Sequence, residues 1–144
     1  MTNLILMNID NETVRKAEQS GLTATLGIKF LPTPEADTCA ACMKASEATG
    51  QPFGFLSGGA TLALAETLAG MGSMLLCEGR ICVGVNVSGN HLRAVPVGDN
   101  VTAYGRLLHK GRNLHQWQVD VKNAKGQLVS SVSVTNYIAN SRKS

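Results

Sequence analysis

The sequence has few aromatic residues and little excess charge of either sign. Only 4% of its 144 residues are Phe, Trp or Tyr, so we expect a core built mainly from Ala, Leu, Val and Met. The net charge of +3 is too small to predict nucleic-acid binding, although it permits a local basic patch for a phosphorylated ligand. The length predicts a single domain over residues 1–144, and the hydrophobic fraction of 44% argues against disorder.

A secretion signal and a membrane span are both disfavoured. A secretion signal needs a basic start followed by an apolar stretch, but Asp10 and Glu12 lie in this part of the sequence. The longest apolar run, residues 58–77, is long enough to cross a bilayer, but Glu66 lies at its centre. A carboxylate there costs about 2.5 kcal/mol or more. We therefore expect a buried helix, no membrane association and a cytoplasmic protein.

Cysteine is scarce, with four residues in the chain: Cys39, Cys42, Cys77 and Cys82. The spacing of Cys39 and Cys42 resembles a zinc or redox motif. Their surroundings predict a strand, in which residues three apart point to opposite faces of the sheet. We therefore expect no metal site, and free thiols typical of a reducing cytoplasm.

The hydrophobic pattern predicts a short helix, two strands, one long buried helix and at least three more strands. The apolar residues of 58–77 occur on every side of the predicted helix, which therefore needs cover from more than one direction. One sheet can cover one side, and a second subunit can cover the other. A turn at 123–126 joins the last two strands, and consecutive hairpins imply an antiparallel sheet. The expected helices span 10–20, capped by Asp10 or Asn11 and ended by Gly21, and 58–77; the expected strands span 22–31, 38–44, 81–88, 101–110, 114–123 and 128–138; and 46–56 is expected to be a structured loop.

Glu66 is the only charged residue between Glu47 and Glu78. A lone carboxylate in a buried helix costs several kcal/mol unless something neutralises or uses it. One interpretation is a desolvated base or nucleophile. The alternative is that Glu66 lies on a solvent-facing stripe of the helix.

The start of the same helix offers a second chemical feature. Gly58 and Gly59 would let a ligand approach unpaired backbone N–H groups at the positive end of the helix, where they could polarise a carbonyl. The alternative is that Ser57 is simply an N-cap followed by glycines. Glu66 lies about 12 Å beyond Gly58 along the axis, so one chain cannot bring both to one carbonyl carbon. If both act on one substrate, two antiparallel helices from two chains must share the site.

Four segments together resemble hotdog-fold acyl-CoA thioesterases, especially those acting on hydroxybenzoyl-CoA and dihydroxynaphthoyl-CoA. They are QPFGFLSGGATLALAE (51–66), GVNVSGNHLR (84–93), HKGR (109–112) and QWQV (116–119), and the resemblance covers nearly the whole chain. It implies an α+β hotdog fold, in which an antiparallel β-sheet wraps around one long central α-helix. It also implies hydrolysis of an aryl or medium-chain acyl-CoA to the free acid and coenzyme A.

The resemblance also implies roles for individual residues. Glu66 is expected to be the nucleophile or general base, the Gly58 N–H to bind the thioester oxygen, and Gln51 to position the reacting group. Basic residues are expected near the coenzyme A phosphates, polar residues in the pantetheine tunnel and apolar residues around the acyl group. These expected substrate-binding residues are Arg93, Lys110, Gly111, Arg112, Asn90, His91, Phe53, Leu68 and Met71.

Two positions depart from the family pattern. Ser57 stands where the family usually has His, and Gly70 where it often has Ser or Thr. The departure at Ser57 keeps open an alternative function, a non-catalytic acyl-CoA-binding hotdog protein. A hotdog dehydratase is disfavoured, because no His lies in the helix or in the loop before it. We expect a dimer, and further a tetramer, with shared active sites and with no cofactor other than the coenzyme A of the substrate.

Overall fold

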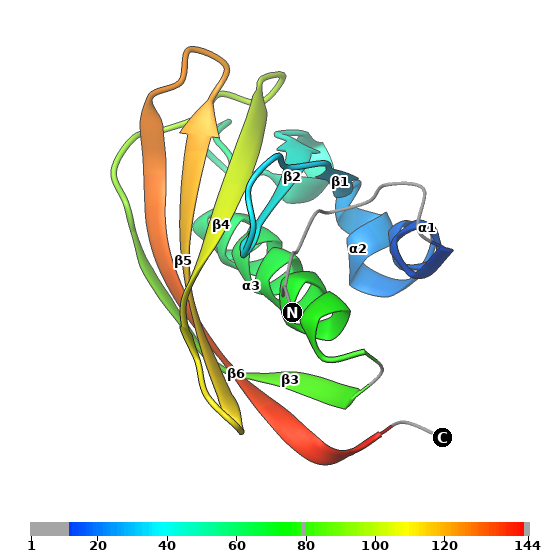
Figure 1. Ribbon diagram of the computed structural model, residues 1–144. Helices are drawn as coiled ribbons and strands as arrows, with labels where there is room; N and C mark the ends of the chain where they lie inside the picture. Colours follow the sequence, from blue (N-terminus) through cyan, green and yellow to red (C-terminus); the bar gives the residue numbers. More distant parts are fainter. Residues whose placement is uncertain (1–11, 79, 143–144) are drawn as a thin grey trace.

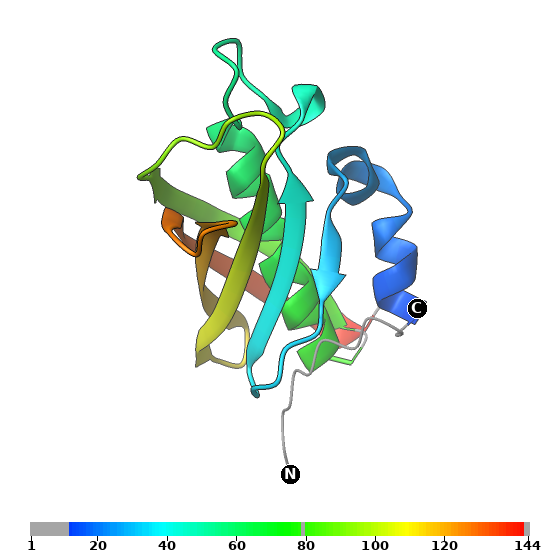
Figure 2. The ribbon, with the colours of Figure 1, turned by 90° about the horizontal axis from the view of Figure 1, so that it is seen from above.

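One six-stranded antiparallel sheet curves around a central helix in the computed structural model, which describes residues 12–78 and 80–142 (Figure 1; Figure 2). The strand order is β1-β2-β4-β5-β6-β3, so β1 and β3 form the two edges. The elements in chain order are α1 (Glu12–Glu18), α2 (Gly21–Leu26), β1 (Lys29–Leu31), β2 (Thr38–Lys44), the 3-10 turn η1 (Glu47–Thr49), α3 (Gly58–Leu76), β3 (Arg80–His91), β4 (Asn100–Lys110), β5 (Leu114–Asn123) and β6 (Leu128–Arg142).

Helix α3 confirms the long helix predicted from the apolar run. Ser57 caps its start, because the Ser57 Oγ accepts the Gly59 N–H at 3.2 Å. Its sheet-facing side, which includes Leu64 and Leu68, is fully buried. Length and composition alone would allow α3 to cross a membrane, and 44% of its most apolar 18-residue stretch is buried inside this single chain. The remaining face is half-buried and includes Glu66.

The core lies between α3 and the concave face of the sheet. In β5, Trp117, Val119 and Val121 are fully buried and alternate with partly exposed polar residues, as the sequence predicted. Trp117 packs directly against Gly72 of α3, where a Cβ would lie 2.7 Å from the indole ring. This close approach seats the helix on the sheet. The predicted turn at 123–126 also forms, with Gly126 at φ 79°.

The predicted strand over residues 22–31 is wrong in its first half. Residues Gly21–Leu26 form α2, and only Lys29–Leu31 form a strand. Leu22 and Leu26 are one helical turn apart, and both border the hollow beside the start of α3. Gly27 ends α2 in the left-handed conformation, with φ 70°. The first predicted helix is confirmed as α1, and its expected caps Asp10 and Asn11 lie outside the described residues. The expectation that Gly21 ends this helix is wrong, because α1 ends at Glu18 and Gly21 begins α2.

The remaining predictions of secondary structure are confirmed, with small extensions. Strand β2 has the predicted bounds, β3 runs on to His91, and the loop before α3 contains the short turn η1. Cys39 is fully buried while Cys42 is half-buried, and both are free thiols. Within residues 12–78 and 80–142, no three His, Cys, Asp or Glu side chains are grouped to hold a metal ion.

Candidate active site

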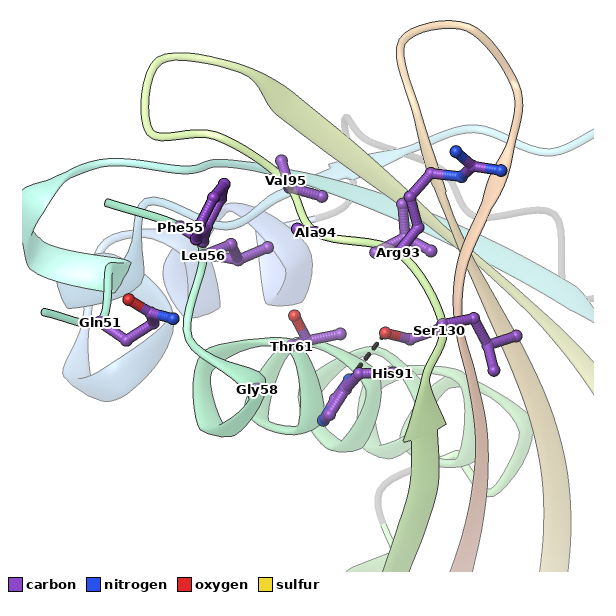
Figure 3. Close-up of a pocket in the computed structure, with 12 residues that line it drawn as sticks. Gln51, Phe55, Leu56, Gly58, Thr61, His91, Arg93, Ala94, Val95 and Ser130 are labelled. Atoms are coloured by element: carbon purple, nitrogen blue, oxygen red, sulfur yellow. Dashed lines mark hydrogen bonds between the residues drawn. The ribbon is translucent and has the colours of Figure 1, made fainter. Parts of the chain in front are cut away.

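A hollow of about 300 Å³ opens at the start of α3, between the helix and the loop that follows β3 (Figure 3). The loop from Gln51 to Leu56 forms one wall, and the end of β3 with the first residues of β6 forms the other. Its lining includes four of the expected site residues: Gln51, Gly58, His91 and Arg93. The structure therefore brings together the residues expected around the thioester oxygen with part of the expected coenzyme A site.

Gln51 is held by its own loop. Its side-chain Oε1 accepts the backbone N–H of Phe53, which leaves the amide NH₂ free to donate towards a ligand in the hollow. Phe53 itself is 83% exposed and does not line this hollow. Phe55 takes the lining position instead.

His91 lies directly against Gly58. A Cβ on Gly58 would be 2.7 Å from the His91 Nε2, so only glycine leaves room for the imidazole at this position. The other ring nitrogen, Nδ1, is 2.8 Å from the Oγ of Ser130. Figure 3 shows the ring between Ser130 and the first turn of α3. Ser130 was not predicted as a site residue, because it is 39 positions from His91 and becomes its neighbour only through the β3–β6 register.

Ser57 lies apart from Gln51 and Gly58, the expected catalytic residues that line the hollow. Its Oγ is occupied as the helix cap, and Ser57 borders a separate hollow together with Leu22 and Leu26 of α2. It is absent from the lining of the hollow that contains Gly58 and His91. The geometry thus matches the N-cap interpretation of this serine.

Glu66 lies half-buried on the face of α3 next to the edge strand β3. Its carboxylate rests on Gly84, and any Cβ at position 84 would overlap with it. Among the described residues, nothing forms a hydrogen bond or an ion pair with Glu66. Glu66 does not line the hollow around Gly58, which agrees with the expected separation of about 12 Å along the helix. A single chain therefore presents the Glu66 carboxylate and the Gly58 end of α3 on two separate surfaces.

The remaining expected residues divide between two ends of the sheet. Asn90 and Arg93 lie near His91, and the Arg93 guanidinium points away from the helix start (Figure 3). Residues 110–112 follow the opposite end of the sheet, where the Arg80 Nη2 donates to the Arg112 carbonyl at 3.4 Å. Leu68 and Met71 lie in the hydrophobic core and do not line the hollow. Within one chain, the structure does not bring these groups together.

A buried polar cluster joins the C-terminal half of α3 to the sheet. The Ser73 Oγ lies 2.8 Å from His115 Nδ1, and it accepts the Trp117 Nε1–H at 2.9 Å and an Asn136 N–H at 3.0 Å. Burial, together with the smaller effects of nearby Lys110, Arg80 and His109, lowers the pKa of His115 to about 4. His115 is therefore neutral at neutral pH. The cluster holds α3 in place at the end opposite the hollow.

The antiparallel sheet around one long central helix is the architecture of hotdog-fold thioesterases. Residues 53–130 match the model of the thioesterase superfamily, and the chain belongs to this family. The expected fold and the expected activity, thioester hydrolysis, are thereby confirmed.

Three similar proteins agree with this assignment. The 1,4-dihydroxy-2-naphthoyl-CoA hydrolase of Escherichia coli is 32% identical, over 88% of this chain and 93% of its own length. The proofreading thioesterase EntH of Klebsiella pneumoniae is 38% identical, over 77% of this chain and 80% of its own length. The crystal structure of a thioesterase from Haemophilus influenzae superposes with a TM-score of 0.85 at 32% identity, covering 93% of this chain and 92% of that one.

Proposed function

We propose that this protein hydrolyses the thioester of an aryl or medium-chain acyl-CoA, with Glu66 as the catalytic carboxylate. The observation that carries the proposal is the position of Glu66, half-buried on α3 and without a hydrogen-bond or ion-pair partner among the described residues. The substrate class is supported by the Escherichia coli relative, whose name gives an aromatic acyl-CoA. The reaction needs no cofactor, because coenzyme A enters only as part of the substrate.

The site is shared between two copies of the chain. Strand β3 is an edge of the sheet and exposes the apolar side chains of Ile81, Val83 and Val85. Gly84 faces Glu66, so Val83 next to it in the strand and Ile81 beyond it lie on the outer face of the sheet. A second copy joined antiparallel along this edge would continue the sheet and place its own helix beside the open face of α3. It would also bring its Glu66 towards the Gly58 end of the first chain. A dimer of this kind has two equivalent sites, and two dimers would form the expected tetramer.

The chemistry follows from these positions. The Glu66 carboxylate attacks the thioester carbonyl carbon, or it removes a proton from a water molecule that attacks. The carbonyl oxygen gains negative charge, which the Gly58 N–H at the positive end of α3 stabilises. The C–S bond then breaks, and coenzyme A leaves as a thiolate. If Glu66 attacks, water then hydrolyses the bond between the acyl group and Glu66. If Glu66 activates water, that water becomes part of the acid directly. The free acid is released in both routes.

Basic residues at both ends of the sheet support coenzyme A binding across the same interface. Arg93 lies beside the hollow. Residues 110–112 of a second copy would approach it from the opposite end of an antiparallel pair. Guanidinium and ammonium groups pair well with phosphate oxygens, so Lys110 and Arg112 suit the phosphates of coenzyme A. The four free thiols support a cytoplasmic location.

A thiol-release assay over a panel of acyl-CoAs tests the proposal. We expect higher kcat/KM for benzoyl-, hydroxybenzoyl- and hexanoyl-CoA than for acetyl- and palmitoyl-CoA. Affinity is measured in parallel by calorimetry with the same compounds. Tight binding without any thiol release would contradict the proposal and identify a non-catalytic acyl-CoA-binding protein.

A further inference from the structure

The first turn of α3 has one imidazole beside it, and this imidazole comes from strand β3. His91 Nε2 would lie 2.7 Å from a Cβ on Gly58. Because a Cβ is roughly 2.5 Å from the amide nitrogen of its own residue, Nε2 lies within about 5 Å of the Gly58 nitrogen. One oxygen atom at ordinary hydrogen-bond distance, about 2.9 Å, can reach two donors separated by that much. Gly58 and His91 can therefore bind the same oxygen.

The hydroxyl of Ser130 determines which ring nitrogen of His91 carries the proton. Ser130 is fully buried. Among the described residues, its hydroxyl has His91 Nδ1 as its hydrogen-bond partner, at 2.8 Å. A buried hydroxyl hydrogen without an acceptor is costly, so Ser130 donates to Nδ1. The proton of the neutral imidazole then resides on Nε2, the nitrogen next to Gly58 and the hollow.

Two other polar side chains of the described structure lie near Gly58, and both are held elsewhere or on another wall. The Ser57 hydroxyl caps the helix and borders the hollow next to α2. Gln51 lines the same hollow as His91, but from the loop on its other wall (Figure 3). His91 touches Gly58 itself and is fixed by a buried partner.

We propose that His91, oriented by Ser130, is a second hydrogen-bond donor to the thioester oxygen, beside the Gly58 N–H. This inference rests on the proposed function and adds a catalytic residue and a positioning residue to it. The Nε2–H strengthens its bond as the oxygen becomes negative in the transition state, so its contribution appears mainly in kcat. In this role the Nε2–H donates a hydrogen bond and transfers no proton.

The test combines kinetics with imidazole NMR. We expect His91→Ala to lower kcat by roughly 10²-fold with little change in KM, the size typical for the loss of one oxyanion donor. Ser130→Ala should lower kcat less, and the double variant should match His91→Ala alone, because Ser130 acts through His91. His109→Gln, an exposed histidine on β4, is the matched control. A rise in KM at unchanged kcat in His91→Ala would overturn the proposal and make His91 a binding residue only.

The NMR readout does not depend on turnover. In the wild-type protein, ¹⁵N shifts of His91 should show the proton on Nε2, and Ser130→Ala should redistribute it between the two nitrogens. A proton on Nδ1 in the wild type would refute the assigned geometry even if the enzyme is active. If instead no acyl-CoA is hydrolysed, the proposed function fails, and His91 as an oxyanion donor fails with it. The acyl-CoA panel assay therefore distinguishes a failure of the proposed function from a failure of the His91 proposal alone.

Discussion

The Glu66 carboxylate rests on Gly84, in the space that a side chain at position 84 would occupy. Gly84 precedes an irregularity in the β3–β6 pairing, between Gly84 and Asn86, at the edge of the sheet. The edge strand thus leaves room for the carboxylate and limits where it can lie. We therefore expect Gly84 to act as a positioning residue for the proposed catalytic group.

Gly84→Ala should displace the Glu66 carboxylate and lower kcat by about 10²-fold, the scale expected for a misplacement of about 1 Å. Steady-state kinetics with the best acyl-CoA measures this effect. In a Glu66→Gln background the same change should have almost no additional effect, because the group it displaces is already lost. Ser88→Ala, at an exposed position on the same strand, is the control. A Gly84→Ala enzyme with wild-type kcat would refute the positioning role.

Two glycines of α3 should respond oppositely to replacement by alanine. Gly72→Ala places a methyl group 2.7 Å from the Trp117 ring, whose Nε1–H is bonded to Ser73, so we expect the free energy of unfolding to fall by about 1–3 kcal/mol. A Cβ at position 70 would meet nothing within 4 Å in the described chain. Gly70→Ala should therefore raise the free energy of unfolding by about 0.5–1 kcal/mol through helix propensity. Urea unfolding of both variants measures the two values. Equal effects would mean that α3 is not seated on Trp117 as described.

His115 should make stability depend on pH. Its folded pKa of about 4 lies below the ordinary value of 6.5, so the unfolded chain binds more protons between these two values. The free energy of unfolding should therefore decrease as the pH falls from 6.5 towards 4, with a slope from this residue approaching 1.4 kcal/mol per pH unit, to within about a factor of two. Urea unfolding at several pH values measures the slope.

His109→Gln is the control for that titration and should retain most of the slope, because His109 is exposed on β4 and has a smaller effect on the His115 pKa than burial, Lys110 or Arg80. His115→Gln should flatten the curve in the same window. An unchanged slope in His115→Gln would assign the pH dependence to other groups.

The sequence predicted most of the fold because its hydrophobic period changes where the structure changes. The alternation around Trp117 and the apolar run after Gly58 each identified an element. Leu22, Ala24 and Leu26 alternate as in a strand, but Leu22 and Leu26, four residues apart, also lie on one face of a short helix. Local spacing could not distinguish the two, and packing of α2 beside the start of α3 decided the outcome.

Apart from the residues that the family resemblance indicated, the candidate site was predictable only where one segment contains the chemistry. Glu66 and Gly58 were visible as an isolated carboxylate and a helix start. The contacts of His91 with Gly58 and Ser130 depend on strand register, which joins residues more than 30 positions apart. The support of Glu66 by Gly84 likewise requires β3 to lie alongside α3. Neither relationship leaves a signal in the sequence itself.

The shared active site is the central claim, and subunit complementation tests it most directly. Glu66→Gln removes the carboxylate, while Gly58→Pro removes the backbone N–H and also displaces His91, since proline carries a Cβ. Each variant alone should have a kcat reduced by roughly 10²-fold or more. Mixed and allowed to exchange subunits, they form heterodimers in which one of two sites is intact, and random pairing should restore about a quarter of the wild-type activity. Verified heterodimers without recovery would contradict a site shared between two chains.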